Sequence, residues 1–314
     1  MAYEPTKVTV EVEGRRLRLS SLEKVMFPRT GTTKAQVLDY YARIGPVILP
    51  HLRDRAVTRI RFPHGVGDMQ FFEKNIPAGT PAWIRRAGRD PVFPLIDDLA
   101  GLTYFANLNS LELHVHQWRY EGEGRDAVPL NPDRLVIDLD PGPGTGLLEC
   151  ARVALIVRER LGRIGLDTVP VTSGSKGLQL YAVLPGAHTS DEVRDTVQQL
   201  AQELTKAHPD LVVWKMAKEL RPGKVFLDWS QNVAAKTTVC PYSLRGRDEP
   251  TVAAPRSWAE IEAGAEGSGG TGASGGPDGP DGAGGAGGGG LAQLRMDEVL
   301  ARVEADGDLA ESIT

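Results

Sequence analysis

The sequence predicts a protein of the α+β (mixed α/β) class, with one continuous core and a basic N-terminal lobe. Three observations support this class. Apolar segments of strand length alternate with longer segments of helical periodicity. Glycine and proline turns separate them, as at Pro141-Gly142 and at Ser173–Gly177. Hydrophobic residues make up 41% of the 314 residues and charged residues 25%, which is typical of a soluble globular protein.

The elements are expected in the following order. Thr33 and Gln36 form a capping-box pattern that opens a helix through about Arg43, and residues 56–62 alternate as a half-buried strand with a basic face. Further strands are expected at residues 135–140, 168–171, 178–184 and 224–229, and further helices at 147–161, 190–206 and 296–305, with Ser190 as the cap of the second. No internal repeat is visible, so we expect a single core rather than an array.

A glycine-rich stretch, residues 264–290, interrupts this pattern and holds 15 of the 36 glycines. Its composition offers too little apolar surface to offset the entropy of ordering it, which predicts a flexible segment. Motifs on both sides suggest an insertion in one domain rather than a domain boundary. We therefore expect a catalytic domain over residues 1–263, a flexible insertion over 264–290, and a C-terminal helix within 291–314 that completes the same domain.

The charge is unevenly distributed. The whole chain has 36 basic and 41 acidic residues, a net of −5, whereas residues 14–61 contain eleven Lys or Arg against three acids. Such a patch favours a polyanionic partner, although a solvated face is an equally good interpretation of charge alone. No apolar run is long enough to span a membrane, and no secretory signal opens the chain. The two cysteines are 90 positions apart, which predicts neither a zinc site nor a disulfide and favours the cytoplasm.

Asp138 and Asp140 are the first candidates for chemistry. Residues two apart on a strand share a face, so both carboxylates project together from an apolar strand. Divalent cations would relieve the repulsion between them. Asp228, embedded in a second apolar strand, could add a third carboxylate and complete a two-metal site. A D-x-D pair also occurs in glycosyltransferases and at ordinary strand ends, and Asp228 could instead cap a loop or pair with Arg245.

Thr172-Ser173-Gly174-Ser175-Lys176-Gly177 lies between two expected strands. Its hydroxyls, its glycine-freed amides and its lysine suit a triphosphate. The spacing is not that of a Walker A loop, and an ordinary hairpin connection is the alternative.

Four motifs in this order, D-L-D-P-G-P-G, T-S-G-S-K-G-L-Q-L-Y, K-V-F-L-D-W-S-Q-N and P-Y-S-L-R-G-R, resemble the polymerase domain of bacterial DNA ligase D. That domain belongs to the archaeo-eukaryotic primase superfamily and serves non-homologous end joining. The likeness runs from about Leu19 to Leu309 and includes L-E-L-H-V-H-Q-W at 111–118. It implies a primase-like core, a mixed or antiparallel sheet flanked by helices.

The resemblance implies roles for individual residues. Asp138, Asp140 and Asp228 would bind two catalytic Mg²⁺ or Mn²⁺ ions. The incoming NTP or dNTP would contact His114 near its sugar and Ser173, Lys176, Gln179, Arg221, Gln231 and Arg245 elsewhere. Most relatives have histidine where this chain has Gln179, which can donate a hydrogen bond to phosphate but cannot be cationic. The family favours ribonucleotides.

The resemblance also implies how DNA is held. Lys24 and Lys34 match the lysines that bind the 5′-phosphate of a downstream strand. Phe72, together with Phe71, matches the aromatic on which a template base stacks, and core packing is the alternative. We expect one of these two rings to pack inward.

The expected function is therefore a template-directed DNA repair polymerase that extends primer 3′-ends at gaps and double-strand breaks in non-homologous end joining. No K-x-D-G adenylation motif is present, so we expect no ligase module and a free-standing polymerase domain. Its partners would be 5′-phosphorylated gapped or broken DNA, nucleotides, Ku and a separate DNA ligase, in the cytoplasm on the nucleoid and away from membranes. The alternatives are gap filling in excision repair, de novo priming, a non-catalytic end-bridging module and a D-x-D glycosyltransferase.

Overall fold

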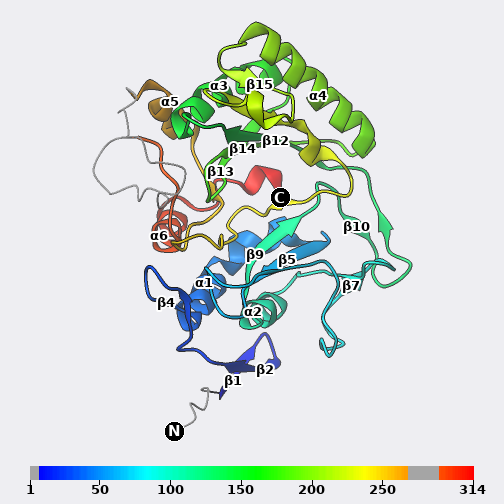
Figure 1. The fold of residues 1–314 in the computed structure, drawn as a ribbon. Helices are drawn as coiled ribbons and strands as arrows, with labels where there is room; N and C mark the ends of the chain where they lie inside the picture. The colour runs from blue at the N-terminus through cyan, green and yellow to red at the C-terminus, as the bar shows by residue number, and fades with distance from the viewer. Residues whose placement is uncertain (1–6, 268–289) are drawn as a thin grey trace.

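A computed structural model describes residues 7–267 and 290–314 and confirms the α+β class (Figure 1). Two β-sheets, each with its own helices, lie one above the other, with the C-terminus between them. The helices of the described residues are α1 (Lys34–Leu52), α2 (Leu99–Asn107), α3 (Leu147–Gly162), α4 (Ser190–Ala207), α5 (Trp258–Glu266) and α6 (Met296–Asp306), with 3₁₀ turns η1 (Lys218–Leu220), η2 (Trp229–Asn232) and η3 (Glu311–Ile313).

The larger sheet has six strands. Their order is β15 (Val212–Val213), β16 (Val225–Asp228), β12 (Arg134–Pro141), β14 (Leu178–Val183), β13 (Thr168–Thr172) and β18 (Ala254–Pro255). All neighbours are antiparallel except β15 and β16. The strand β12 is central and, with eight residues, is the longest strand of this sheet.

Residue alternation decides what each face of this sheet does. Three residues of β12 enter a hydrophobic cluster with α3, α4 and α5: Leu135, Ile137 and Leu139. Val136 instead enters the cluster of the N-terminal lobe, which is built from the smaller sheet with α1, α2 and α6. Helices α3, α4 and α5 accordingly lie on the outer side of the sheet in Figure 1. The core is thus divided by the sheet into two large clusters, and the face of β12 that carries Val136 also carries Asp138 and Asp140.

The smaller sheet has the order β17 (Thr238–Val239), β9 (Ser110–Val115), β5 (Val57–Arg61) and β6 (Phe71–Glu73). It packs with α1, α2 and α6 around one buried cluster that reaches the larger sheet through Val136, Val171 and Tyr181. Four two-stranded ribbons complete the structure: β1 (Lys7–Val12) with β2 (Arg15–Ser20), β3 (Val25–Phe27) with β4 (Thr32–Thr33), β7 (Arg86–Ala87) with β8 (Phe93–Pro94), and β10 (Tyr120–Glu121) with β11 (Val128–Pro129).

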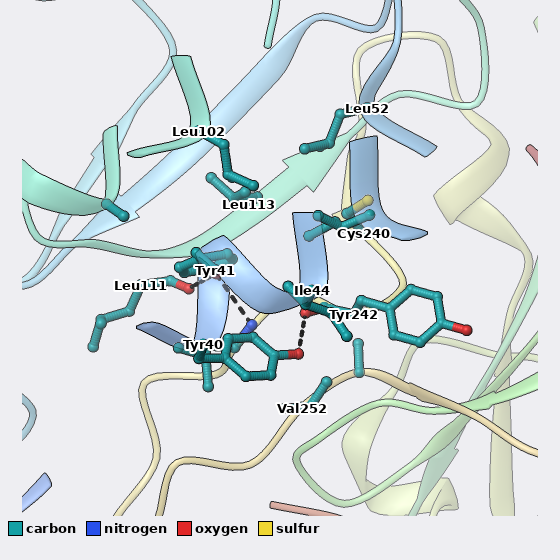
Figure 2. Close-up of a cluster of buried hydrophobic side chains, with 14 of the residues drawn as sticks. Tyr40, Tyr41, Ile44, Leu52, Leu102, Leu111, Leu113, Cys240, Tyr242 and Val252 are labelled. Atoms are coloured by element: carbon teal, nitrogen blue, oxygen red, sulfur yellow. Dashed lines mark hydrogen bonds between the residues drawn. The ribbon is translucent and has the colours of Figure 1, made fainter. Parts of the chain in front are cut away.

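Two buried tyrosines of α1 fix the segment that leads to Arg245 (Figure 2). Tyr40 Oη donates to the carbonyl of Tyr242 at 2.7 Å. Tyr41 Oη donates to the carbonyl of Leu111 at 2.6 Å and accepts from the Leu244 amide at 3.2 Å. Because these hydroxyls are buried and bonded to backbone, they hold the chain just before Arg245 against α1 and β9.

Several expected boundaries need correction. The capping box of Thr33 and Gln36 is present, but α1 runs nine residues past Arg43 to Leu52, with Pro46 and Pro50 inside it. Its buried side continues through Ile44, Ile48 and Leu52, so tertiary packing outweighs the cost of the prolines. The cap of α4 is Thr189, one residue before Ser190, and its side chain accepts from the Glu192 amide.

The structure corrects the start of the expected glycine-rich insertion. Residues 264–266 belong to α5, and residues 268–289 lie outside the described residues. After them, Val299 and Leu300 of α6 and Ile313 of η3 join the cluster of the N-terminal lobe. In the described ranges, no helix has both the length and the hydropathy to cross a membrane.

Candidate active site

Three neighbouring strands bring the predicted carboxylates together. In the β12–β16 register Asp138 lies directly opposite Asp228, and in the β12–β14 register it lies opposite Gln179. On β16 Val225 and Leu227 face the α3–α5 cluster, so Asp228 faces the other way, as Asp138 does on β12. The same alternation that builds the core therefore gathers these polar side chains on the face toward the N-terminal lobe.

Asp138, Asp140 and Asp228 each offer a carboxylate oxygen, and these oxygens lie within 4.8 Å of one another. Asp138 and Asp228 are buried. Burial raises the pKa of Asp138 well above its ordinary value, and the charges of Asp140 and Asp228 raise it further. Burial, and then Asp228, likewise raise the pKa of Asp140. Three crowded carboxylates offer the oxygen donors that hard divalent cations prefer, and a bound cation would relieve the repulsion between them, so the residues fit Mg²⁺ or Mn²⁺.

Neighbouring side chains orient these carboxylates. The Ser230 amide and hydroxyl donate to Asp228 Oδ1 at 2.9 and 2.5 Å, and Gln231 Nε2 donates to Asp228 Oδ2 at 2.9 Å. Lys236 Nζ donates in turn to Ser230 Oγ. On the other flank, Gln179 Nε2 donates to Asp138 Oδ1 at 3.2 Å. Such contacts fix carboxylates for metal binding.

The loop Ser173–Gly177 lies beside the carboxylates and is a tight, internally bonded turn. Ser173 Oγ accepts from the amides of Ser175 at 3.3 Å and Gly177 at 3.1 Å. A Cβ on Gly177 would lie 2.3 Å from the carbonyl oxygen of Leu139, so only glycine allows the loop to approach β12 this closely. The loop therefore holds Ser173, Ser175 and Lys176 at the edge of the acidic site.

His114 is joined to Arg245 through Glu112, a residue that the sequence reasoning did not single out. Glu112 Oε2 lies 2.8 Å from His114 Nε2 and 3.1 Å from Arg245 Nε, and Glu112 Oε1 accepts from the Gly246 amide at 2.8 Å. Burial would raise the pKa of Glu112, but the hydrogen bond with His114 and the charge of Arg245 outweigh it and lower the pKa to about 2. Glu112 is thus an ionised anchor for both residues.

Arg221 reaches the site from a loop that packs on the Pro141–Gly144 turn. Its guanidinium lies 3.7 Å from the ring centre of Phe226 and donates to the Met216 carbonyl at 2.8 Å. A Cβ on Gly142 would lie only 2.0 Å from the Arg221 carbonyl oxygen. The absence of a side chain at Gly142 therefore lets this loop lie against β12. There the charge of Arg221 partly offsets the rise in the pKa of Asp140 that burial and Asp228 cause.

One cleft of about 390 Å³ collects the predicted residues. His114, Asp138, Asp140, Ser173, Lys176, Gln179, Arg221, Gln231 and Arg245 all line it, and Asp228 lies within the acidic cluster beside it. The lining also includes Thr237, Thr238, Val239 and Arg247, which the sequence reasoning did not assign. Arg247 lies two residues after Arg245 in the P-Y-S-L-R-G-R motif, so the motif could have indicated that Arg247 lines the cleft as well.

Lys24 and Lys34 form a separate basic site at the start of α1. The Lys34 amide donates to the Lys24 carbonyl at 2.8 Å. Lys24 Nζ donates to the carbonyl of Pro63 at 2.9 Å, and Lys34 Nζ donates to the carbonyl of Ser20 at 2.8 Å. Burial, followed by the charge of Lys24, lowers the pKa of Lys34 to about 8. Two cations held together at a helix N-terminus suit an anion of high charge, such as a terminal phosphate.

The rest of the basic stretch is partly neutralised. Five of its eleven cations form ion pairs: Arg29 with Asp248 and Glu249, Arg43 with Asp39 and Glu304, Arg55 with Asp133, and Arg59 and Arg61 with Glu73. The sequence therefore overstates the net positive field of residues 14–61.

Phe71 and Phe72 lie on the edge strand β6 and are 42% and 58% exposed. The expectation that one of them packs inward is wrong, because both side chains are exposed and neither joins the buried cluster of this lobe. Arg61 lies 6.0 Å from the ring centre of Phe71. Two exposed rings offer a surface on which bases could stack.

Comparison with known proteins confirms the resemblance. The family model for the LigD primase-polymerase domain matches residues 33–271. The multifunctional non-homologous end joining DNA repair protein LigD of Mycobacterium tuberculosis is 44% identical over 307 residues, covering 95% of this chain and 37% of the relative. The bifunctional LigD of Bacillus subtilis is 34% identical over 250 residues, covering 79% of this chain and 40% of the relative.

A solved structure agrees with the sequence matches. The polymerase domain of Mycobacterium tuberculosis ligase D, in complex with DNA, superimposes with a TM-score of 0.84 at 44% identity, covering 95% of this chain and 98% of that domain. The chain thus spans less than half of these two curated relatives but nearly all of the solved Mycobacterium tuberculosis polymerase domain.

Proposed function

Because this chain belongs to the LigD primase-polymerase family, we propose that it is a template-directed repair polymerase that extends primer 3′-ends at DNA gaps and breaks during end joining. The observation that carries the proposal is a cluster of three carboxylates, two of which line one cleft together with a Ser/Lys-containing loop. In the reaction the primer 3′-hydroxyl attacks the α-phosphate of a nucleotide, a new phosphodiester forms, and pyrophosphate leaves.

Asp138, Asp140 and Asp228 would hold two Mg²⁺ or Mn²⁺ ions. Bound there, the ions would lower the pKa of the attacking hydroxyl and neutralise charge on the leaving oxygens. Ser230 and Gln231 hold Asp228 in position, and Gln179 does the same for Asp138. The protein's part in the chemistry is therefore to fix these two carboxylates before substrate arrives.

The cationic side of the cleft would take the triphosphate. Lys176, Arg221, Arg245 and Arg247 all line the cleft, and their positive charge balances the phosphates. Ser173, Gln179 and Gln231 add polar contacts on the same lining. His114, held by Glu112, would lie near the nucleotide sugar, where a 2′-hydroxyl contact would favour ribonucleotides over deoxyribonucleotides.

The DNA would be held outside the cleft. Lys24 and Lys34 would bind the 5′-phosphate of a downstream strand, and Phe71 and Phe72 would stack on template bases. Relatives are named as non-homologous end joining proteins, and a similar solved domain is in complex with DNA, which supports broken DNA as substrate. Ku and a separate DNA ligase are the partners that we propose for this pathway. We further propose that residues 1–263 and 291–314 form one domain, with the glycine-rich segment as an insertion, because Val299, Leu300 and Ile313 join the core of the N-terminal lobe.

Primer extension on a gap of a few nucleotides tests this function. In the presence of Mn²⁺, duplexes with a downstream 5′-phosphate would be compared with duplexes that lack it, and NTPs and dNTPs would be supplied in parallel. We expect templated addition, preferably of NTPs, and stimulation by the phosphate. Addition without stimulation would favour general gap filling or priming. DNA binding with no addition, in a protein that remains folded, would refute the polymerase and favour an end-bridging module.

A further inference from the structure

Gln293 bonds to both glycines of the loop Ser173–Gly177. Its Oε1 accepts from the Gly174 amide at 2.7 Å, and its Nε2 donates to the Gly177 carbonyl at 3.1 Å. The second contact joins residues 116 positions apart in the chain. A single side-chain amide thus spans the loop, with donor and acceptor each used once.

The backbone on either side of Gln293 is fixed. Leu294 accepts from the Val252 amide at 2.9 Å, and the Met296 amide donates to the Pro250 carbonyl at 3.0 Å. Thr251, in the paired stretch, donates through Oγ1 to the Gly174 carbonyl at 2.5 Å. The segment that carries Gln293 is therefore anchored to a stretch that itself bonds to the loop.

The loop needs such support because its conformation is unusual. Gly174 has φ +67°, and a Cβ there would lie 2.7 Å from the backbone of Val252. The amides of Ser175 and Gly177 already point inward to Ser173 Oγ, so they hold the turn together rather than face the cleft. Among the described residues, Gln293 alone ties the first glycine of the turn to the last through one side chain.

We propose that Gln293 is a positioning residue for nucleotide binding, which holds the loop Ser173–Gly177 in its binding conformation before the triphosphate enters. This inference rests on the proposed polymerase function. Gln293 does not line the cleft, so it acts through the loop rather than by touching the nucleotide. A loop ordered in advance loses less conformational entropy on binding, and that gain appears as tighter nucleotide binding.

The test compares Gln293→Met, which keeps the length of the side chain but makes neither hydrogen bond, with Gln293→Ala. Gln199→Met is the matched control, since Gln199 is exposed on α4 and bonds only to Glu203 among the described residues. Steady-state extension gives KM and kcat, and hydrogen exchange of the Gly174 amide in nucleotide-free protein reports the loop directly.

We expect Gln293→Met and Gln293→Ala to raise the nucleotide KM alike, about tenfold for the loss of one to two neutral hydrogen bonds, with kcat within about twofold. Exchange at Gly174 should accelerate in both variants and not in Gln199→Met. An unchanged KM in Gln293→Met overturns the inference, and so does a rise confined to Gln293→Ala, because packing would then explain it.

A binding measurement separates this inference from the proposed function. Intrinsic fluorescence would report the affinity for a non-hydrolysable NTP in the presence of Mn²⁺. If the wild-type chain binds the NTP but fails to extend primers, the polymerase proposal fails while the effect of Gln293 on NTP affinity is still measured. An affinity that is the same in wild type and Gln293→Met overturns the positioning role.

Discussion

Gln179 Nε2 donates to Asp138 Oδ1 across paired positions of β14 and β12, and Tyr181 Oη donates at 2.9 Å to the other end of the same amide. Gln179 is buried, and both ends of its amide have partners within the protein. Its first effect is therefore to orient a carboxylate of the proposed metal site, in addition to lining the nucleotide cleft.

Replacing Gln179 should accordingly weaken metal use. We expect Gln179→Ala to raise the Mn²⁺ concentration for half-maximal extension about tenfold, which is the lower end of the effect of losing an outer-shell partner. Tyr181→Phe should give a smaller shift in the same direction. A Mn²⁺ titration of primer extension measures both, with Gln199→Ala as the control. An unchanged midpoint in Gln179→Ala would contradict this role.

The acidic cluster should limit the stability of the metal-free protein. The pKa of Asp138 is raised in the folded state, so this state holds a proton more tightly than the unfolded chain. The stability contribution of Asp138 is therefore greatest at low pH and falls as pH rises above the ordinary aspartate pKa.

Asp138→Asn removes the free-energy cost of ionising a buried carboxylate, and it should also abolish activity. We expect the Tm of the metal-free variant to exceed that of the wild type by a few degrees, for a gain of about 1 kcal/mol, with the difference growing as pH rises above the ordinary aspartate pKa. Mn²⁺ should raise the Tm of the wild type more than that of Asp138→Asn. Equal Tm values at every pH, or unimpaired extension by the variant, would refute the assignment.

How much could be read from the sequence depended on the strength of the local pattern. The alternation in β12 was enough to predict that Asp138 and Asp140 share a face. Asp228 was only a candidate for a third carboxylate, and the pairing of β12 with β16, which local pattern does not encode, places it opposite Asp138. Glu112 and His114 are also two apart on one strand. The same reasoning could have predicted that they lie together, but not that Arg245 completes the group from another segment.

Other features were beyond local reasoning because distant contacts decide them. Pro46 signals the end of a helix, yet α1 continues because Ile48 and Leu52 extend its buried side. The exposure of both Phe71 and Phe72 follows from the position of β6 at the edge of its sheet, which no pattern in the strand itself encodes. The role of Gln293 depends on a contact across more than a hundred residues.

Recognition of the 5′-phosphate should depend on pH. With its pKa lowered to about 8, Lys34 loses its proton as pH rises through that value in DNA-free protein. Phosphate binding needs the charged form, so the rate ratio between phosphorylated and unphosphorylated gaps should fall above about pH 8. Lys34→Arg should keep the ratio flat, provided that its melting curve shows a folded protein. A flat ratio in the wild type would place the phosphate elsewhere.

Phe72 should contribute to template binding without contributing to stability. Its ring is 58% exposed, so Phe72→Ala should leave the Tm nearly unchanged. Loss of a base stack should weaken binding of gapped DNA by about 1–3 kcal/mol. Fluorescence anisotropy measures this affinity, and Val128→Ala, at an exposed site on β11, is the control. Equal DNA affinities for both variants would exclude Phe72 as the stacking residue.

Gly142 should couple the Arg221 loop to the active site. A Cβ at this position would lie 2.0 Å from the Arg221 carbonyl oxygen and 2.8 Å from that of Lys224, and neither backbone atom can yield without moving the loop. We expect Gly142→Ala to cost about 1–3 kcal/mol of stability and to raise the nucleotide KM, because Arg221 would be displaced from the cleft.

Gly146→Ala, two residues beyond the Pro141–Gly144 turn at the N-cap of α3, is the matched control for Gly142→Ala. A Cβ at Gly146 meets nothing within 4 Å, so this variant should retain both the Tm and the KM of the wild type. Urea unfolding and steady-state extension on the same preparations separate the two effects. If Gly142→Ala loses stability but binds nucleotide normally, the contact is purely structural, whereas a raised KM means that the position of the loop against β12 sets the affinity of the cleft.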